Sequence, residues 1–175
     1  MRKYIGVFAA IAGCTLALTS PASAATNFFR INQFDSKLPL TAESASEGAR
    51  VVLSGINQFN FRQQWSIKTN AGTAALTYVL RQKISSNGQL VDGCLDLPRD
   101  VNRDQQQPGE VLVVRKCDGS NSQKWLDVNT NSSTGTVNLE NSLSLMKLDV
   151  VNNVAVQKFV SSPSQRVFKV FVTSA

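Results

Sequence analysis

The chain has 175 residues, of which 42% are hydrophobic, and it carries a formal net charge of +6. It contains no histidine, which excludes a Ser-His-Asp or Cys-His catalytic centre and a histidine-ligated zinc site. Its lysines and arginines are scattered without a dense basic run, which argues against a nucleic-acid-binding groove.

Residues 1–24 have the pattern of a secretory signal peptide. Arg2 and Lys3 precede an apolar run over residues 5–18, and the small residues Ala22-Ser23-Ala24 follow it. Cleavage after Ala24 would leave 151 residues with a net charge of +4, a length that fits one domain with a full core. We therefore expect a secreted, extracellular protein.

A lipoprotein is the alternative interpretation of this end of the chain. Ile11-Ala12-Gly13-Cys14 resembles a lipobox, in which Cys14 would carry the lipid anchor. The apolar sequence continues beyond Cys14, which favours the cleaved signal peptide. No run approaches the ~20 apolar residues of a spanning helix, so we expect no transmembrane segment.

The rest of the sequence consists of short β-type runs separated by turn residues, a pattern typical of an all-β barrel or sandwich. Residues 99–109 are polar and end in Pro108-Gly109, which predicts an exposed loop insertion. The β-type runs include residues 28–31, 50–53, 78–80, 111–114, 154–156 and 167–172.

Cleavage after Ala24 leaves two cysteines, Cys94 and Cys117. An even number of cysteines in an exported chain predicts one disulfide. The bond would close a loop of 24 residues and stabilise the fold by roughly 3 kcal/mol. Disulfide-bonded cysteines do not ligate zinc, so we predict neither a metal site nor a cofactor.

Three segments repeat one arrangement, at residues 49–67, 109–128 and 152–170. Each has a β-rich run, a turn-rich interval, a glutamine followed closely by an aromatic residue, and another strand. Closing three such units around a common axis removes free sheet edges and makes one core. The marks are Gln63-Gln64-Trp65, Gln123-Lys124-Trp125 and a worn third copy, Gln165-Arg166-Val167-Phe168.

The second unit resembles the ricin-B-type lectin repeat, in which Cys-Leu-Asp is followed by Val-x-Val-x-x-x-Cys and then Gln-x-Trp. The resemblance extends over nearly all of residues 27–172. It implies a β-trefoil over residues 25–175, a six-stranded barrel capped by three hairpins, with repeats near 27–69, 76–129 and 136–172. The matching residues are Cys94, Leu95, Asp96, Val111, Val113, Cys117, Gln123 and Trp125.

We interpret the Gln-x-Trp pairs, Gln63 with Trp65 and Gln123 with Trp125, as structural. A buried tryptophan contributes a large apolar area, and its indole N–H needs a hydrogen-bond partner. The glutamine amide can satisfy backbone groups where the chain turns. The pairs therefore argue for the fold more strongly than for sugar binding.

The resemblance implies a sugar site made of an acid, a glutamine and an aromatic residue on the next strand, and a polar residue before the last glutamine. A carboxylate accepts hydrogen bonds from neighbouring hydroxyls, and an aromatic ring covers the C–H face of a sugar. The third repeat fits this pattern best. Its candidate residues are Asp149, Gln157, Phe159, Ser164 and Gln165.

The second repeat offers a weaker site of Asp96, Arg115 and Gln123, because Arg115 presents no aromatic face. The first repeat lacks the acid and has Leu53 at the aromatic position. We therefore expect the first repeat to be silent.

The leading hypothesis is a secreted, non-catalytic carbohydrate-binding protein, with a galactose-type preference implied by the resemblance. The alternative is a trefoil that no longer binds sugar and contacts a protein partner through residues 54–62 and 99–109, as a toxin cell-binding subunit or a hydrolase inhibitor would. A two-carboxylate glycosidase is disfavoured, because the acids form no paired motif.

Overall fold

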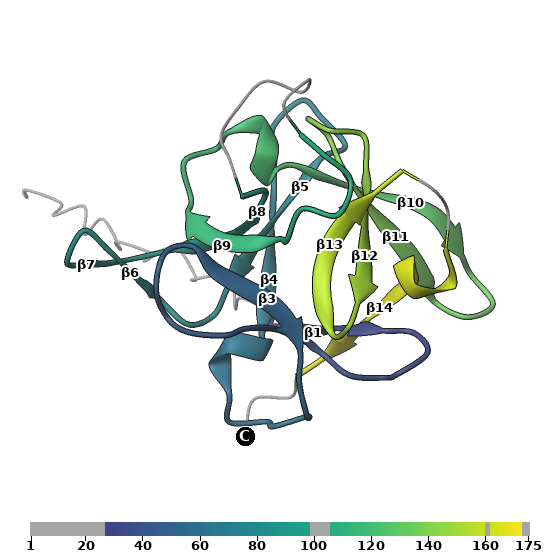
Figure 1. Ribbon diagram of the computed structural model, residues 1–175, viewed down its shortest axis with the longest axis horizontal. Helices are drawn as coiled ribbons and strands as arrows, with labels where there is room; N and C mark the ends of the chain where they lie inside the picture. Colours follow the sequence, from purple (N-terminus) through teal and green to yellow (C-terminus); the bar gives the residue numbers. More distant parts are fainter. Residues whose placement is uncertain (1–26, 99–105, 160–161, 173–175) are drawn as a thin grey trace, which may run out of the picture.

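The structure is a computed structural model that describes residues 27–98, 106–159 and 162–172. The predicted signal peptide, Cys14 and most of the 99–109 loop lie outside the described residues. The described chain consists of β-strands joined by turns and short 3-10 helices (Figure 1).

The described strands fall into three successive groups that correspond to the repeats. The first group contains β1 (Phe29–Gln33), β2 (Leu40–Ala42), β3 (Ala49–Leu53) and β4 (Trp65–Thr69). The second contains β5 (Leu76–Leu80), β6 (Ile84–Ser86), β7 (Gln89–Val91), β8 (Gly93–Asp96), β9 (Val113–Lys116) and β10 (Trp125–Asn131). The third contains β11 (Thr136–Asn141), β12 (Lys147–Val151), β13 (Val154–Lys158) and β14 (Val167–Phe171).

Six of these strands close into a barrel. Following the antiparallel pairs, β1 is bonded to β4, β4 to β5, β5 to β10, β10 to β11, β11 to β14 and β14 back to β1. The first and last described strands, β1 and β14, pair over five residues, from Phe29↔Phe171 to Gln33↔Val167. A closed circuit leaves no barrel edge for another chain to pair with.

Three hairpins, β2–β3, β8–β9 and β12–β13, form a cap over the barrel. Each contacts the next, through the pairs Val52↔Val154 and Ala49↔Val114 and the isolated bridge Val111↔Val156. A six-stranded barrel with a three-hairpin cap is the all-β architecture, a β-trefoil, that the resemblance to the ricin-B-type repeat implied. The predicted fold class is therefore confirmed.

The core lies on the axis and draws on all three repeats. Trp65 and Trp125 are fully buried, and their indole Nε1–H groups donate to the carbonyl oxygens of Leu40 and Leu95, each at 3.1 Å. In the third repeat Val167 occupies the equivalent barrel position, opposite Gln33, and is fully buried. Phe168, expected to stand in for the tryptophan, is only half-buried and packs edge-on against Phe34.

The glutamine before each tryptophan position closes the turn that leads into the barrel. Gln63, Gln123 and Gln165 end the 3-10 helices η1 (Phe61–Gln63), η3 (Asn121–Gln123) and η4 (Pro163–Gln165). Each Oε1 accepts a backbone N–H of the preceding loop, from Asn57, Asp118 and Ser162 respectively. The glutamines thus satisfy donors that the loop would otherwise leave unpaired.

The second repeat has two features of its own. A disulfide joins Cys94 in β8 to Cys117 beyond the end of β9, as predicted. The β6–β7 hairpin, which the sequence analysis did not predict, extends away from the barrel at the left of Figure 1. Its turn residues Asn87 and Gly88 have φ values of +49° and +77°, the left-handed pair that a tight hairpin turn requires.

Candidate functional site

Strand register identifies the equivalent acid positions of the three repeats. Thr41 pairs with Val52, Asp96 with Val113 and Asp149 with Val156. The first repeat therefore has a hydroxyl where the others have a carboxylate. Thr41 Oγ1 lies 2.7 Å from the hydroxyl of Ser54, and Gln63 Nε2 donates to that hydroxyl at 2.8 Å.

In the second repeat the structure brings Asp96 and Gln123 together. Gln123 Nε2 donates to Asp96 Oδ2 at 2.9 Å, and the backbone N–H of Leu97 donates to Oδ1 at 2.7 Å. Burial raises the pKa of Asp96, while hydrogen bonds from Gln123 and Ser122 and the charge of Arg115 lower it in part. The carboxylate is only 1% exposed, so in this geometry it holds the turn and does not face solvent.

In the third repeat Asp149 lies beside Ser164 and Lys158. The Ser164 hydroxyl donates to Asp149 Oδ1, which also accepts the backbone N–H of Val150 at 2.7 Å. Asp149 Oδ2 makes no hydrogen bond among the described residues and lies 3.6 Å from Lys158 Nζ. The Lys158 side chain is 42% exposed whereas that of Asp149 is fully buried. Of the two charged groups, only the lysine is therefore accessible to a ligand at the surface.

Gln157 does not join this group. Because Asp149 pairs with Val156, the next residue along β13 points to the opposite face of the hairpin. Gln157 is fully buried there, and its Nε2 donates to Gln106 Oε1 and Glu110 Oε2, both at 3.0 Å. The position that shares the face of Asp149 is Lys158, which corresponds to Arg115 in the second repeat.

Phe159 lies on the surface just beyond the end of β13, with 58% of its area exposed. It lines a mainly apolar pocket of about 270 Å³ together with Pro108, Gly109 and Lys158. The pocket joins the second and third repeats, because Gly109 donates its backbone N–H to the Gln157 carbonyl at 2.7 Å. Phe159 was predicted from the sequence, but Lys158 was not, although it occupies the position of Arg115 in the second repeat.

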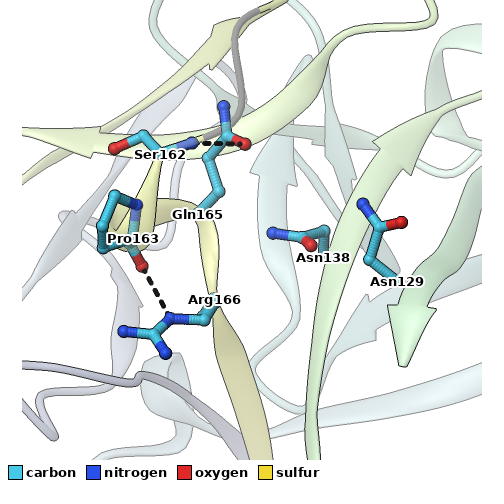
Figure 2. A pocket seen from close by; sticks show the side chains of 6 residues that line it. All are labelled: Asn129, Asn138, Ser162, Pro163, Gln165 and Arg166. Atoms are coloured by element: carbon cyan, nitrogen blue, oxygen red, sulfur yellow. Dashed lines mark hydrogen bonds between the residues drawn. The ribbon is translucent and has the colours of Figure 1, made fainter. Parts of the chain in front are cut away.

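A second pocket, of about 420 Å³, lies between η4 and the β10–β11 hairpin (Figure 2). Asn129 and Asn138 of the β10–β11 hairpin face the turn that contains Pro163 and Arg166. This pocket was not predicted from the sequence, since no motif connects residues of the hairpin with η4. Its lining residues are Asn129, Asn138, Ser162, Pro163, Gln165 and Arg166.

In the described part of the chain, no group of three or more histidine, cysteine, aspartate or glutamate side chains is arranged to hold a metal ion. Within the same ranges, no helix has the length and apolar character needed to cross a membrane.

No protein-family model and no curated protein sequence matches this chain. Solved structures do match it. The designed threefold-symmetric protein ThreeFoil superimposes with a TM-score of 0.66 at 21% identity, over 82% of this chain and 97% of that one. A Polyporus squamosus lectin bound to the epitope Neu5Acα2-6Galβ1-4GlcNAc gives 0.60 at 13% identity, over 85% of this chain and 50% of that one.

An enzyme also contains the same architecture. The exo-β-1,3-galactanase 1,3Gal43A from Clostridium thermocellum matches with a TM-score of 0.66 at 17% identity, over 85% of this chain but only 31% of the enzyme. At these identities the likeness concerns the fold alone. The comparisons therefore assign this chain to the β-trefoil fold, which a sugar-binding lectin and part of a glycosidase share with it.

Proposed function

We propose that the protein binds carbohydrate without catalysis, and that its main site lies in the third repeat around Phe159, Lys158 and Asp149. The observation that carries the proposal is an exposed aromatic ring at the mouth of a pocket, next to an ammonium group that a buried carboxylate holds in place. The β-trefoil neighbours that bind saccharides support this reading.

Each of the three residues has a distinct part in the proposed site. The ring of Phe159 covers the apolar C–H face of a sugar. Lys158 Nζ donates hydrogen bonds to ring hydroxyls, and Asp149 keeps that ammonium group over the site through its charge. Asp149 acts on the sugar through Lys158, because its own carboxylate is fully buried.

The non-catalytic assignment is supported by the state of the carboxylates in the cap. Asp96 and Asp149 sit in different repeats, and each is held by its own turn. A glycosidase places two carboxyl groups on either side of one bond. Asp96 and Asp149 instead accept hydrogen bonds in two different repeats. Secretion through residues 1–24 and a galactose-type preference are part of the same proposal.

The proposal is tested by probing a glycan array with the mature protein, produced in its natural host. We expect binding to at least one saccharide, and Phe159→Ala should weaken it about tenfold, which corresponds to about 1.4 kcal/mol. The matched control is Phe59→Ala, because Phe59 is also an exposed phenylalanine, at 75%, but lies in the first repeat. Unchanged binding by Phe159→Ala would refute the location of the site.

A protein partner is the second candidate function. Residues 54–62, the loop that this alternative invokes, expose Ile56 at 56% and Phe59 at 75%. Apolar side chains at a loop tip on a rigid scaffold favour a contact surface. In that case no saccharide binds on the array, and a partner captured by the wild type is lost with Phe59→Ala but retained with Phe159→Ala.

A further inference from the structure

We propose that the pocket between η4 and the β10–β11 hairpin is a second saccharide subsite, which takes a neutral sugar ring through the amides of Asn129 and Asn138. The choice of ligand rests on the proposed carbohydrate-binding function, but the site is separate from Phe159. In Figure 2 the Asn138 side chain points toward Pro163 and Gln165 across the pocket.

Asn138 is the central observation. The residue is 8% exposed, and its side-chain amide makes no hydrogen bond with the described part of the chain although it faces the pocket. The amide is reached from the pocket and is not among the described side-chain groups that are buried without a partner, so a ligand there would replace water that is free to leave. A ligand hydroxyl is suited to this place, since it can both accept from the amide nitrogen and donate to the amide oxygen.

Asn129 brings a second amide to the same pocket through an irregularity in the hairpin. The register of β10 and β11 shifts between Val128 and Asn131, and Asn129 has a φ of +51°. Asparagine tolerates this left-handed conformation better than most residues, and such irregularities redirect side chains at functional positions. The shift therefore aims an amide at the pocket from the exposed end of the hairpin.

The β4–β5 hairpin occupies the position equivalent to β10–β11 one repeat earlier, so the two hairpins can be compared within the molecule. Thr77 pairs with Lys68 as Asn138 pairs with Val128, three residues beyond the respective tryptophan. There Asn70 Nδ2 donates to Thr77 Oγ1 at 3.2 Å and to the Ala75 carbonyl at 2.9 Å. In the β4–β5 hairpin the asparagine amide is hydrogen-bonded within the hairpin itself. In the β10–β11 hairpin the amides of Asn129 and Asn138 are available to another molecule.

The lining favours an uncharged ring. Pro163 offers an apolar face to the C–H groups of a sugar. Arg166 is already engaged, because its Nε donates to the Pro163 carbonyl at 3.4 Å and its Nη2 lies 3.2 Å from Asp35 Oδ1. The pocket thus presents amides and an apolar surface, which suit ring hydroxyls better than a carboxylate or a sulfate.

NMR of the side-chain amides tests the proposal directly. Galactose, N-acetylglucosamine and sodium sulfate are titrated separately, each to ~50 mM, a range that detects millimolar affinity. At least one of the two sugars should shift the Asn129 and Asn138 amide resonances, and sulfate should not. No shift with either sugar, or a shift with sulfate alone, overturns the proposal.

Two variants separate the pocket from the rest of the molecule. Asn138→Thr copies the residue of the preceding repeat, and Asn129→Gly keeps the left-handed backbone while removing the amide. Either should weaken the sugar response of the pocket about tenfold and leave the Phe159 ring signals responding as before. A response confined to Phe159 sustains the proposed function and refutes this subsite; a response confined to the pocket supports the subsite and refutes the location at Phe159.

Discussion

Single carboxylates in this protein are distinguished by what surrounds them. Asp96 is buried and held by Gln123, whereas Glu43 on the surface has its pKa lowered by a hydrogen bond and the charge of Arg50. The same residue class therefore stabilises a turn in one place and forms an exposed ion pair in another. Exposed pairs of this kind contribute little to stability, so the buried carboxylates are the informative ones to change.

Asp96 predicts a pH dependence with a definite sign. Because burial raises its pKa in the folded state, the native protein binds this proton more readily than the unfolded chain does. As pH rises from the ordinary aspartate value through the raised folded value, this group lowers the free energy of unfolding. Below the ordinary value the contribution is constant.

Urea unfolding between pH 4 and 7 checks this prediction. The free energy of unfolding of the wild type, relative to Asp96→Asn, should increase as the pH is lowered, because the variant cannot bind the proton. A difference that is the same at every pH would mean that Asp96 does not titrate differently in the folded and unfolded states.

At the scale of elements, the sequence predicted the repeats well and the register of one hairpin poorly. Trp65 and Trp125 recur at the start of equivalent barrel strands, so their spacing indicated a threefold arrangement. Gln157 was assigned to the sugar site, and the structure places it on the other face. A one-residue difference in register reverses the face of every side chain on a strand, and the sequence does not state which residue pairs with Asp149.

Two further elements escaped the sequence analysis for different physical reasons. The β6–β7 hairpin carried a readable signal, Asn87-Gly88 between β-type residues, which is typical of a tight turn. The pocket of Asn129 and Asn138 carried none, because it depends on where a distant turn packs. Local patterns predict hairpins, whereas surfaces between elements follow from tertiary packing.

The disulfide provides a test at this scale. It joins the ends of the β8–β9 hairpin across a sequence separation of 23, so replacing both cysteines by serine should lower the free energy of unfolding by roughly 3 kcal/mol. Denaturant unfolding of the double variant measures this, with the wild type under reducing conditions as a second comparison. If neither differs from the oxidised wild type, the bond does not contribute to the free energy of unfolding.

At the scale of the whole molecule, one network ties three barrel strands together. The Tyr78 hydroxyl on β5 donates to Asp127 Oδ1 on β10 at 2.6 Å, and Lys169 Nζ on β14 lies 2.5 Å from Asp127 Oδ2. Burial, together with the charge of Asp127, raises the pKa of Tyr78 far above its ordinary value. The second and third repeats are thus connected by polar side chains as well as by strand pairing.

Removing the centre of this network should destabilise the whole barrel. Asp127→Ala leaves the buried Tyr78 hydroxyl and the half-buried Lys169 without their partner, and we expect a loss of about 2 kcal/mol in the free energy of unfolding. Asp35→Ala, which removes an exposed ion pair with Arg166, serves as the control and should cost less than about 0.5 kcal/mol. Equal effects of the two changes would contradict a special role for Asp127.

The closure of the barrel by β1 and β14 has a consequence for how the chain can be connected. The backbone N–H of Val172 donates to the carbonyl of Phe28 at 2.9 Å, so the two ends of the described fold are neighbours. A short linker between them, with new termini opened in the exposed β10–β11 turn at residues 132–135, would give a circular permutant with every strand pair retained. The three repeats would keep their cyclic order in such a permutant, so the fold does not depend on which repeat the chain begins with.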